Sequence, residues 1–345
     1  MRLRADPSVA VVGATGAVGH ELLSLLGARR FPARSIRVFA GPRSAGRVVD
    51  VPGGTATVEP LAEGCFRGTD LAFFAATGSI SREWAPRAVA EGAWAIDKSS
   101  AFRMDPSCAL VIPEVNGASL DRIDGPAIVA VPNCTTIIAL MAVTPLHRRA
   151  GVVRMVVSTY QAVSGAGAAA MAELERQAHE WSAGRPIEPR VFGRQCLFNV
   201  FSHDSAVDGD GHNEEERKLL LETRRIWDDR DVGVAATCVR VPVLRAHTES
   251  IVLTLRTPLA VEEARQLLAE SPGLQVVDDR AGGRFPEPMD AAGSDHVLVG
   301  RLRADPSQPA GLGLMLMVSG DQVRKGAALN GIQIAERLLA SHAQR

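Results

Sequence analysis

Three glycines at every third position, Gly13, Gly16 and Gly19, stand between an apolar run and a helix-like segment near the start of the chain. The run Ser8 to Val12 predicts a strand, and Glu21 to Leu26 predicts a helix. Glycines in such a turn let backbone N–H groups at a helix start approach a phosphate. A plain strand-to-helix turn is the alternative, so the motif constrains the fold more strongly than the function.

The first third of the chain continues this alternation of short apolar runs with helix-like segments. That pattern is typical of a parallel sheet with crossover helices in an α/β fold. The further predicted strands are Ile36 to Ala40, Leu71 to Ala76, Ala93 to Ile96 and Ala127 to Val131.

A different pattern begins at Val152 to Tyr160, after which strand-like runs outnumber helix-like ones. This predicts an α+β region with a mainly antiparallel sheet. Its other predicted strands are Ile251 to Arg256, Leu274 to Val277, His296 to Leu302 and Gly313 to Val318. The stretch Ala183 to Asp210 predicts a loop, and Arg324 to Leu339 predicts a closing helix.

Composition excludes several classes of protein. A formal net charge of -1 gives no reason to expect nucleic acid or an acidic membrane surface as partner. No stretch approaches the roughly 18 apolar residues of a membrane span. The five cysteines are widely spaced, without a metal-ligand pattern, so we expect no metal, free thiols and a cytoplasmic location.

Cys134 follows a predicted strand that Pro132 closes, and it precedes the apolar, helix-like run Ile137 to Val143. A cysteine at a helix start feels the positive end of the helix dipole, which favours the nucleophilic thiolate. The carboxyl edge of a parallel sheet is also where α/β proteins bind ligands. A buried structural cysteine is the alternative interpretation.

The end of the second predicted strand discriminates between cofactors. An acidic residue there binds a ribose 2′-hydroxyl, whereas a cation accepts a 2′-phosphate. This chain has Arg43 and Ser44 and no acid, which favours NADP over NAD; an exposed loop arginine is the alternative. Thr77, after the third strand, is a further candidate for the cofactor groove.

Several ordered segments together resemble the aspartate-semialdehyde dehydrogenase family. They are Gly13 to Gly19, Ser99 to Met104, Pro132 to Thr136, Ser158 to Gly167, Cys238 to His247 and Arg324 to Asn330. The resemblance implies NADP-dependent interconversion of L-4-aspartyl phosphate with L-aspartate 4-semialdehyde and phosphate, in amino-acid biosynthesis that feeds the lysine, threonine and methionine routes. It also implies a Rossmann-type NADP-binding domain at 1–133 and 323–345, and a catalytic and dimerisation domain at 134–322.

The resemblance gives Cys134 the role of the nucleophile that forms an acyl-enzyme, and His247 that of the general acid/base. A neutral imidazole can take the thiol proton and return one to the hemithioacetal oxygen. The remaining histidines, including His203, are interpreted as structural.

The substrate residues also come from the resemblance. Gln161 would orient the substrate or thioester, and Arg240 would bind the α-carboxylate with its planar fork. Glu215 would lie near the substrate ammonium group. The candidate phosphate ligands are Arg103, Lys218 and Asn133.

Cofactor contacts are implied for Gly13, Thr15, Gly16, Ala17 and Val18 in the loop, and for Ser164 and Gly165 against the nicotinamide. Gln322 stands where the family usually has Asn, and it can still offer an amide to the cofactor carboxamide. Val131 and the segment Phe198 to Gly211 also depart from the family pattern. These departures leave room for a paralogue that prefers another acyl phosphate. The family is usually a homodimer or homotetramer.

Three alternatives stay open. N-acetyl-glutamyl-phosphate reductases typically have Pro-Gly-Cys-Tyr at the nucleophile, unlike Asn133 and Thr135 here. Glyceraldehyde-3-phosphate dehydrogenases usually continue Cys-Thr-Thr with Asn-Cys, where this chain has Ile137-Ile138. A non-catalytic dinucleotide-binding relative would need neither the cysteine nor His247, and both are present.

Overall fold

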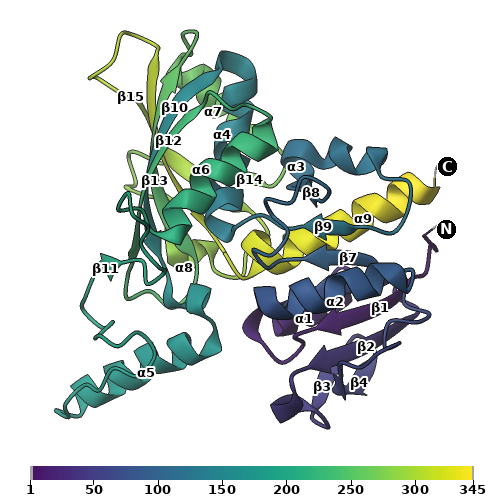
Figure 1. Cartoon of the computed structure of the whole chain (residues 1–345). Helices are drawn as coiled ribbons and strands as arrows, with labels where there is room; N and C mark the ends of the chain where they lie inside the picture. Colours follow the sequence, from purple (N-terminus) through teal and green to yellow (C-terminus); the bar gives the residue numbers. More distant parts are fainter. Residues whose placement is uncertain (1–2, 344–345) are drawn as a thin grey trace. The chain divides into compact units, whose positions relative to one another are not determined.

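The computed structural model describes residues 3–343, and the chain divides into two compact units. The first unit comprises Met1–Asn133 and Ala327–Arg345, and the second comprises Cys134–Gly326. Figure 1 shows the elements of each unit in sequence colours. Among the described residues, no helix has the length and apolar character needed to cross a membrane.

The first unit contains a seven-stranded sheet in the order β5-β2-β1-β6-β7-β9-β8, whose neighbouring strands run parallel. The strands are β1 (Ser8–Val12), β2 (Ser35–Ala40), β5 (Glu59–Pro60), β6 (Leu71–Phe74), β7 (Trp94–Asp97), β8 (Ala109–Leu110) and β9 (Ile128–Ala130). A separate hairpin joins β3 (Val48–Val51) to β4 (Gly54–Thr57). The order places β1 between β2 and β6, so the loops after these three strands share one edge of the sheet.

Helices cover both faces of this sheet. They are α1 (Ala17–Ala28), α2 (Gly78–Ala90), the short α3 (Pro113–Asn116) and α9 (Leu329–Ala343). Two 3-10 turns, η1 (Pro42–Ser44) and η2 (Gly117–Arg122), lie in the connections, and the π-helical turn η4 (Arg324–Ala328) precedes α9. Buried strands explain the near-continuous apolar runs in the sequence, because both faces are covered.

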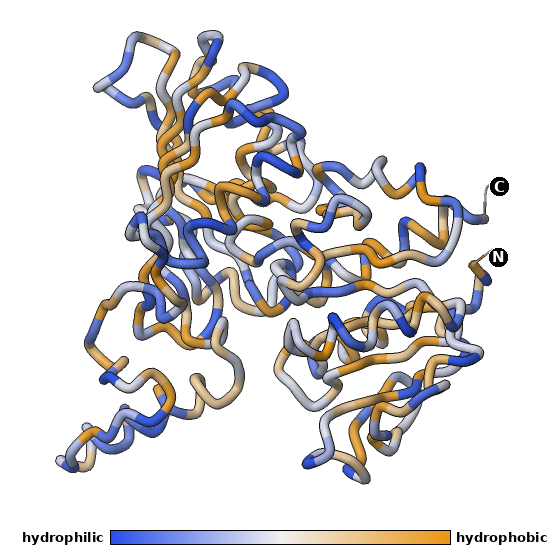
Figure 2. The backbone as a smooth tube through the Cα atoms, in the orientation of Figure 1, coloured by the Kyte–Doolittle hydropathy of each residue, from blue (hydrophilic) through white to orange (hydrophobic). Residues whose placement is uncertain are grey.

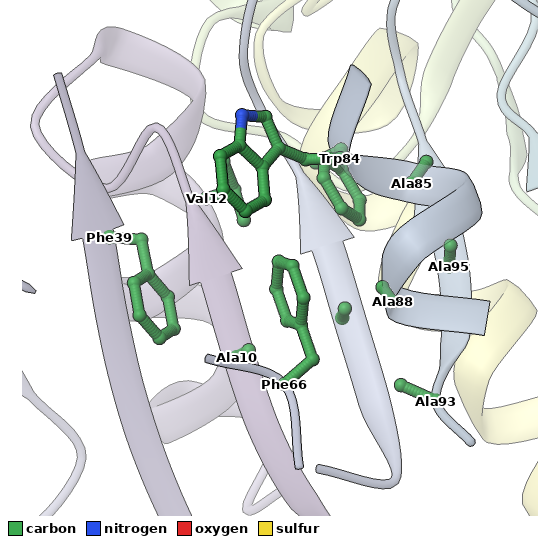
Figure 3. Packing of buried hydrophobic residues seen from close by; sticks show 11 residues of the cluster. Ala10, Val12, Phe39, Phe66, Trp84, Ala85, Ala88, Ala93 and Ala95 are labelled. Atoms are coloured by element: carbon green, nitrogen blue, oxygen red, sulfur yellow. The ribbon is translucent and has the colours of Figure 1, made fainter. Parts of the chain in front are cut away.

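Successive side chains along each strand point to opposite faces of the sheet, and this decides which residues contact which helix. Val12, Phe74 and Ala95 pack with Trp84 and Ala88 of α2 in one buried cluster. Figure 3 shows Val12, Ala95, Trp84 and Ala88 within this cluster. Phe73 and Ile96 point to the other face, where Gly331 of α9 allows close approach of the helix to the sheet. The first unit therefore has a core on each side of its sheet.

The second unit contains a seven-stranded mixed sheet in the order β11-β12-β10-β13-β16-β15-β14. Four neighbouring pairs are antiparallel, and β10·β12 and β14·β15 are parallel. The strands are β10 (Val152–Gln161), β11 (Phe201–Ser202), β12 (Gly233–Arg240), β13 (His247–Leu255), β14 (Leu274–Val276), β15 (Val297–Ala304) and β16 (Gly313–Gly320).

Helices α4 (Cys134–Ala150), α6 (Glu214–Trp227) and α7 (Val261–Ala269) pack against this sheet. The unit also has η3 (Val163–Ala166), α5 (Ala168–Ser182) and the short α8 (Pro288–Ala291). Figure 2 shows long hydrophobic stretches along the strands of the sheet, whereas the outer end of α5 is largely hydrophilic.

The predicted fold class is confirmed: a parallel α/β sheet is joined to a second, mainly antiparallel sheet. The predicted strands lie within a few residues of the observed ones. Strand β12 was not predicted, because its residues Gly233–Arg240 include a glycine and two adjacent alanines and show no regular alternation of apolar and polar side chains. The predicted loop from Ala183 to Asp210 contains one short strand, β11, paired with β12.

Candidate functional site

Cys134 is the first residue of α4, as the sequence predicts, and its side chain is partly exposed. The turn η4 approaches it closely, because a Cβ on Gly326 would lie 2.8 Å from the Cβ of Cys134. Only a glycine fits at that contact without a shift of the backbone or of Cys134. Gly326 is thus a site residue that the sequence analysis did not single out, although it belongs to the Arg324 to Asn330 motif.

The residue after the cysteine joins several candidate residues. The Thr135 hydroxyl donates to Oε1 of Glu215 over 3.3 Å and accepts from Nε2 of Gln161 over 3.1 Å. The Gln161 amide also donates to Thr159 over 3.3 Å. All of these side chains are buried. Thr135 therefore couples α4, α6 and β10 directly beside Cys134.

A capping box explains the position of Glu215 and Lys218 at the start of α6. The Asn213 side chain accepts from the Glu216 N–H, and the Glu216 carboxylate accepts from the Asn213 N–H. This fixes the first turn of the helix. Lys218 follows Glu215 by three residues on the same face, and its Nζ lies 3.3 Å from Oε2 of Glu215.

His247 begins β13 and is fully buried. Its Nδ1 accepts a hydrogen bond from the Ala162 N–H over 3.0 Å, so a neutral ring carries its proton on Nε2. Burial, followed by the positive charge of Arg240, lowers the pKa of His247 to about 3. Nε2 has no hydrogen-bond partner within residues 3–343. The ring is therefore a neutral donor held ready for a ligand atom.

Arg240 ends β12, and only 2% of its surface is exposed. One of its terminal nitrogens, NH1, donates to the Ala162 carbonyl over 2.9 Å. The other, NH2, lies 3.0 Å from Nε2 of His203 and 2.7 Å from Oδ1 of Asp204. His203 was interpreted as structural, and Asp204 belongs to the segment that departs from the family pattern and was given no role. Both nevertheless contact Arg240, the residue predicted to bind the substrate carboxylate. Neither residue carries a local sequence signal, because only the pairing of β11 with β12 brings them there.

Ser164, Gly165 and Gln322 connect the cysteine side of this cluster to the histidine side. A Cβ on Gly165 would lie 3.1 Å from NH1 of Arg240 and 3.2 Å from Cε1 of His247. The Gln322 amide donates to the Ser164 hydroxyl and accepts from the Ala246 N–H. Gln322 also lies next to Gly326, because a Cβ placed on Gly326 would be 3.4 Å from the Cβ of Gln322.

In the first unit, the glycine loop after β1 is shaped by close backbone contacts. Gly13 has φ +84, and a Cβ on it would lie 2.4 Å from the Ala75 carbonyl oxygen. A Cβ on Gly19 would lie 2.2 Å from the Gly13 carbonyl oxygen. Gly16 is the N-cap of α1. The first turn of this helix, which lies within the described residues, carries no acidic side chain that would repel an anion. Backbone N–H groups at a positive helix end form a site suited to a phosphate.

The other candidate cofactor residues follow the neighbouring strands. The Thr15 hydroxyl donates to Ser44 over 3.3 Å, which joins the loops after β1 and β2. Arg43 is exposed beside Ser44 in η1. Thr77 is the N-cap of α2, after β6, and its hydroxyl lies 2.9 Å from that of Ser79. These groups are suited to holding a dinucleotide.

Two candidate phosphate residues also lie in the first unit. The buried Arg103 donates from Nε to the Val131 carbonyl over 3.0 Å, and from NH2 to the Lys98 carbonyl over 2.8 Å. Val131 follows β9 and leads through Pro132 to the buried Asn133. Arg103 therefore fixes the backbone that precedes the cysteine.

The candidates thus form two groups. Cys134, Gln161, Ser164, Gly165, Glu215, Lys218, Arg240, His247 and Gln322 lie in the second unit, and the remaining candidates lie in the first. Within residues 3–343 there is no cluster of three or more side chains suited to a metal ion.

Comparisons with known proteins cover nearly the whole chain. Residues 8–123 match the semialdehyde dehydrogenase NAD binding domain, and residues 143–325 match the semialdehyde dehydrogenase dimerisation domain. An aspartate-semialdehyde dehydrogenase from Synechocystis sp. is 46% identical over 331 residues, which covers 96% of this chain and 97% of the relative. One from Aquifex aeolicus is 44% identical over 96% of this chain and 97% of its own length.

Solved structures agree with these sequence matches. Aspartate semialdehyde dehydrogenase II from Vibrio cholerae has a TM-score of 0.93 and 39% identity, covering 97% of this chain and 99% of that one. The same enzyme complexed with ASA also has a TM-score of 0.93, with 38% identity over 97% of this chain and 98% of that one.

Proposed function

Because the chain belongs to the aspartate-semialdehyde dehydrogenase family, we propose that it reduces L-4-aspartyl phosphate to L-aspartate 4-semialdehyde and releases phosphate. The observation that carries this proposal is the hydrogen-bonded cluster next to Cys134. Thr135 joins Gln161 to Glu215, while Gly165 lies against both Arg240 and His247. One small amino-acid substrate can thus meet a nucleophile, Cys134, and a hydrogen-bond donor, His247. It also meets a positive and a negative side chain, Arg240 and Glu215.

Cys134 attacks the acyl carbon of aspartyl phosphate. A C–S bond forms, the C–O bond to phosphate breaks, and phosphate leaves with the electron pair of that bond. The position of Cys134 at the start of α4 favours its thiolate form. The product of this step is a thioester on Cys134, which is the form that can be reduced to the aldehyde level.

His247 stabilises the oxygen that becomes negative when the thioester carbon turns tetrahedral. Its Nε2–H is the available donor because Nδ1 accepts from the Ala162 N–H. A pKa of about 3 keeps the ring neutral at physiological pH, so this role does not depend on an imidazolium ion. In the direction of aldehyde formation, Nε2–H donates a hydrogen bond to the oxyanion. The oxyanion becomes the aldehyde carbonyl when the C–S bond breaks and the Cys134 thiolate leaves with the electron pair.

Arg240 and Glu215 hold the two charged groups of the aspartyl substrate. The guanidinium of Arg240 suits the α-carboxylate, and the carboxylate of Glu215 suits the ammonium group. Gln161 is fixed by Thr135 and Thr159, and its uncharged amide orients the reacting group without exchanging a proton with the thiolate. Phosphate is bound by Lys218, Arg103 and Asn133.

The residues around the glycine loop would hold NADP, with Gly13, Thr15, Gly16, Ala17 and Val18 at its diphosphate. When bound, this cofactor supplies the hydride that reduces the thioester. Arg43 and Ser44 favour a 2′-phosphate, since no carboxylate follows β2 in η1. Thr77 contributes at the end of β6, and Ser164, Gly165 and Gln322 contribute at the nicotinamide end. The first unit is thus the cofactor-binding domain, and the second unit is the catalytic domain.

The second unit also supports a homodimer, or a homotetramer built from dimers. One face of its sheet carries partly exposed apolar side chains from four adjacent strands, β12, β10, β13 and β16. They are Val156, Val239, Val252, Met315 and Met317, with Tyr160 at 43% exposure. The opposite face is covered by α4, α6 and α7. An exposed apolar sheet face of this kind favours contact with a second copy. Sedimentation of the purified chain measures its mass.

The proposal is tested by following NADP reduction with L-aspartate semialdehyde in the presence of phosphate, beside the same assay with N-acetyl-glutamate semialdehyde. We expect phosphate-dependent reduction with the first aldehyde only. Activity with N-acetyl-glutamate semialdehyde alone would reassign the chain to the alternative reaction. Activity with neither would favour a paralogue that acts on another acyl phosphate, or a non-catalytic relative.

A further inference from the structure

The buried guanidinium of Arg240 already has a carboxylate of its own chain bound to it. Oδ1 of Asp204 lies 2.7 Å from NH2, and the Arg240 side chain is 2% exposed. This is a short, charge-assisted contact at the residue proposed to bind the substrate's α-carboxylate. Asp204 and the substrate would thus use the same chemistry at the same side chain.

The contact follows from how the segment is attached. Phe201 pairs with Arg240 through β11 and β12, and the His203 N–H donates to the Cys238 carbonyl over 2.9 Å. Asp204 comes directly after this last sheet contact, and 37% of its side chain is exposed. Its backbone is tethered to the sheet, but its carboxylate borders solvent and can leave Arg240 by side-chain rotation.

The geometry of a guanidinium makes this contact competitive. A carboxylate bound through two hydrogen bonds uses either the Nε and NH2 edge or the NH1 and NH2 edge. Both edges include NH2, which is the nitrogen that Asp204 and His203 contact. Nε of Arg240 has no hydrogen-bond partner among residues 3–343. Each of the two hydrogens of NH2 serves one edge, and Asp204 and His203 both contact this nitrogen. A substrate carboxylate held by two hydrogen bonds therefore displaces at least one of these two neighbours.

The charges of the neighbours support the same view. Although burial opposes ionisation, the Arg240 guanidinium holds the pKa of the Asp204 carboxyl below its ordinary value. Burial lowers the pKa of His203, so that ring is neutral near pH 7. The anion on Arg240 is thus Asp204, and His203 is a neutral neighbour.

We propose that Asp204 is an internal competitor for the substrate carboxylate: it neutralises Arg240 in the free enzyme and moves aside when a carboxylate-bearing substrate arrives. This rests on the proposed role of Arg240. Asp204 acts through Arg240 as a specificity residue, because a ligand without a carboxylate has nothing with which to replace it. Its presence raises the substrate concentration needed for half-maximal rate.

The test compares Asp204→Asn with a matched control, Asp208→Asn. Asp208 lies in the same segment, is 39% exposed and contacts Arg217 over 2.6 Å, outside the site. With phosphate and NADP fixed, we expect Asp204→Asn to lower KM for L-aspartate semialdehyde about 5-fold, with kcat within about 2-fold of wild type. Asp208→Asn should leave both values unchanged.

A KM that rises in Asp204→Asn would overturn the proposal, since it would mean that Asp204 positions Arg240 for substrate. An unchanged KM would overturn it as well. If Asp204→Asn does not fold, Asp204→Ser provides the same comparison, with the melting temperature as a check. Wild-type inactivity toward L-aspartate semialdehyde would instead contradict the proposed function.

Discussion

The two candidate sites are built in different ways. The glycine loop of the first unit is one continuous stretch of backbone, shaped by the steric needs of Gly13 and Gly19. The cluster of the second unit joins side chains from α4, β10, α6, β12 and β13, whose sequence positions span more than a hundred residues. The first kind of site depends on local conformation, and the second depends on long-range packing and on the partners of buried polar groups.

The glycine loop should be the more sensitive to a single added methyl group. A Cβ at Gly19 would lie 2.2 Å from the Gly13 carbonyl oxygen, so Gly19→Ala forces the backbone to move. We expect a loss of about 3 kcal/mol in the free energy of unfolding, measured by urea denaturation. In the control Gly41→Ala, a Cβ meets nothing within 4 Å, and stability should not fall. Equal behaviour of the two variants would contradict the steric account.

In the cluster of the second unit, the buried His247 should make the free energy of unfolding depend on pH. The pKa of His247 falls from 6.5 to about 3 on folding, so the unfolded chain binds more protons between these values. The free energy of unfolding therefore falls on acidification, by at most about 1.4 kcal/mol per pH unit from this group. Between about pH 7 and about pH 5, wild type should lose up to about 2 kcal/mol more than His247→Gln. Parallel losses in urea titrations would mean that His247 is not buried in its neutral form.

A substitution at Arg43 tests whether a side chain, in addition to the backbone of the glycine loop, contributes to cofactor binding in the first unit. Arg43→Glu should weaken NADPH binding at least about 10-fold, or about 1.4 kcal/mol, because a charged hydrogen bond to the 2′-phosphate is lost and a like charge takes its place. NADH lacks that phosphate and should bind to the variant at least as well as to wild type in fluorescence titrations. Equal losses for the two cofactors would remove Arg43 from the site.

Thr135 tests the coupling inside the second site. Thr135→Val removes the hydroxyl that joins Gln161 to Glu215 but keeps the shape of the side chain. We expect kcat/KM to fall about 5-fold, which corresponds to about 1 kcal/mol. Thr144→Val is the control. Thr144 lies further along α4, and its hydroxyl accepts a hydrogen bond from the Trp227 side chain of α6. A similar decrease in both variants would point to a general effect on the helix.

The contrast also explains what could be predicted from the sequence. Ser8 to Val12, the glycines after it and Cys134 at a helix start are local patterns, and the structure confirms the strand, the turn and the helix. The contacts of His203 and Asp204 with Arg240 depend on β11 joining β12 across nearly forty residues. No spacing in the sequence reveals that pairing. Likewise, Gly326 gains its importance only from the approach of η4 to Cys134.

The proposed reaction depends most on Cys134 as the carrier of the acyl group. The direct measurement is mass spectrometry of the enzyme after reaction with L-aspartate semialdehyde and NADP without phosphate. We predict one aspartyl group on the peptide that contains Cys134, lost when phosphate is added, and absent from Cys134→Ala. Reduction of NADP without this adduct, or an adduct on another cysteine such as the buried Cys238, would contradict the account.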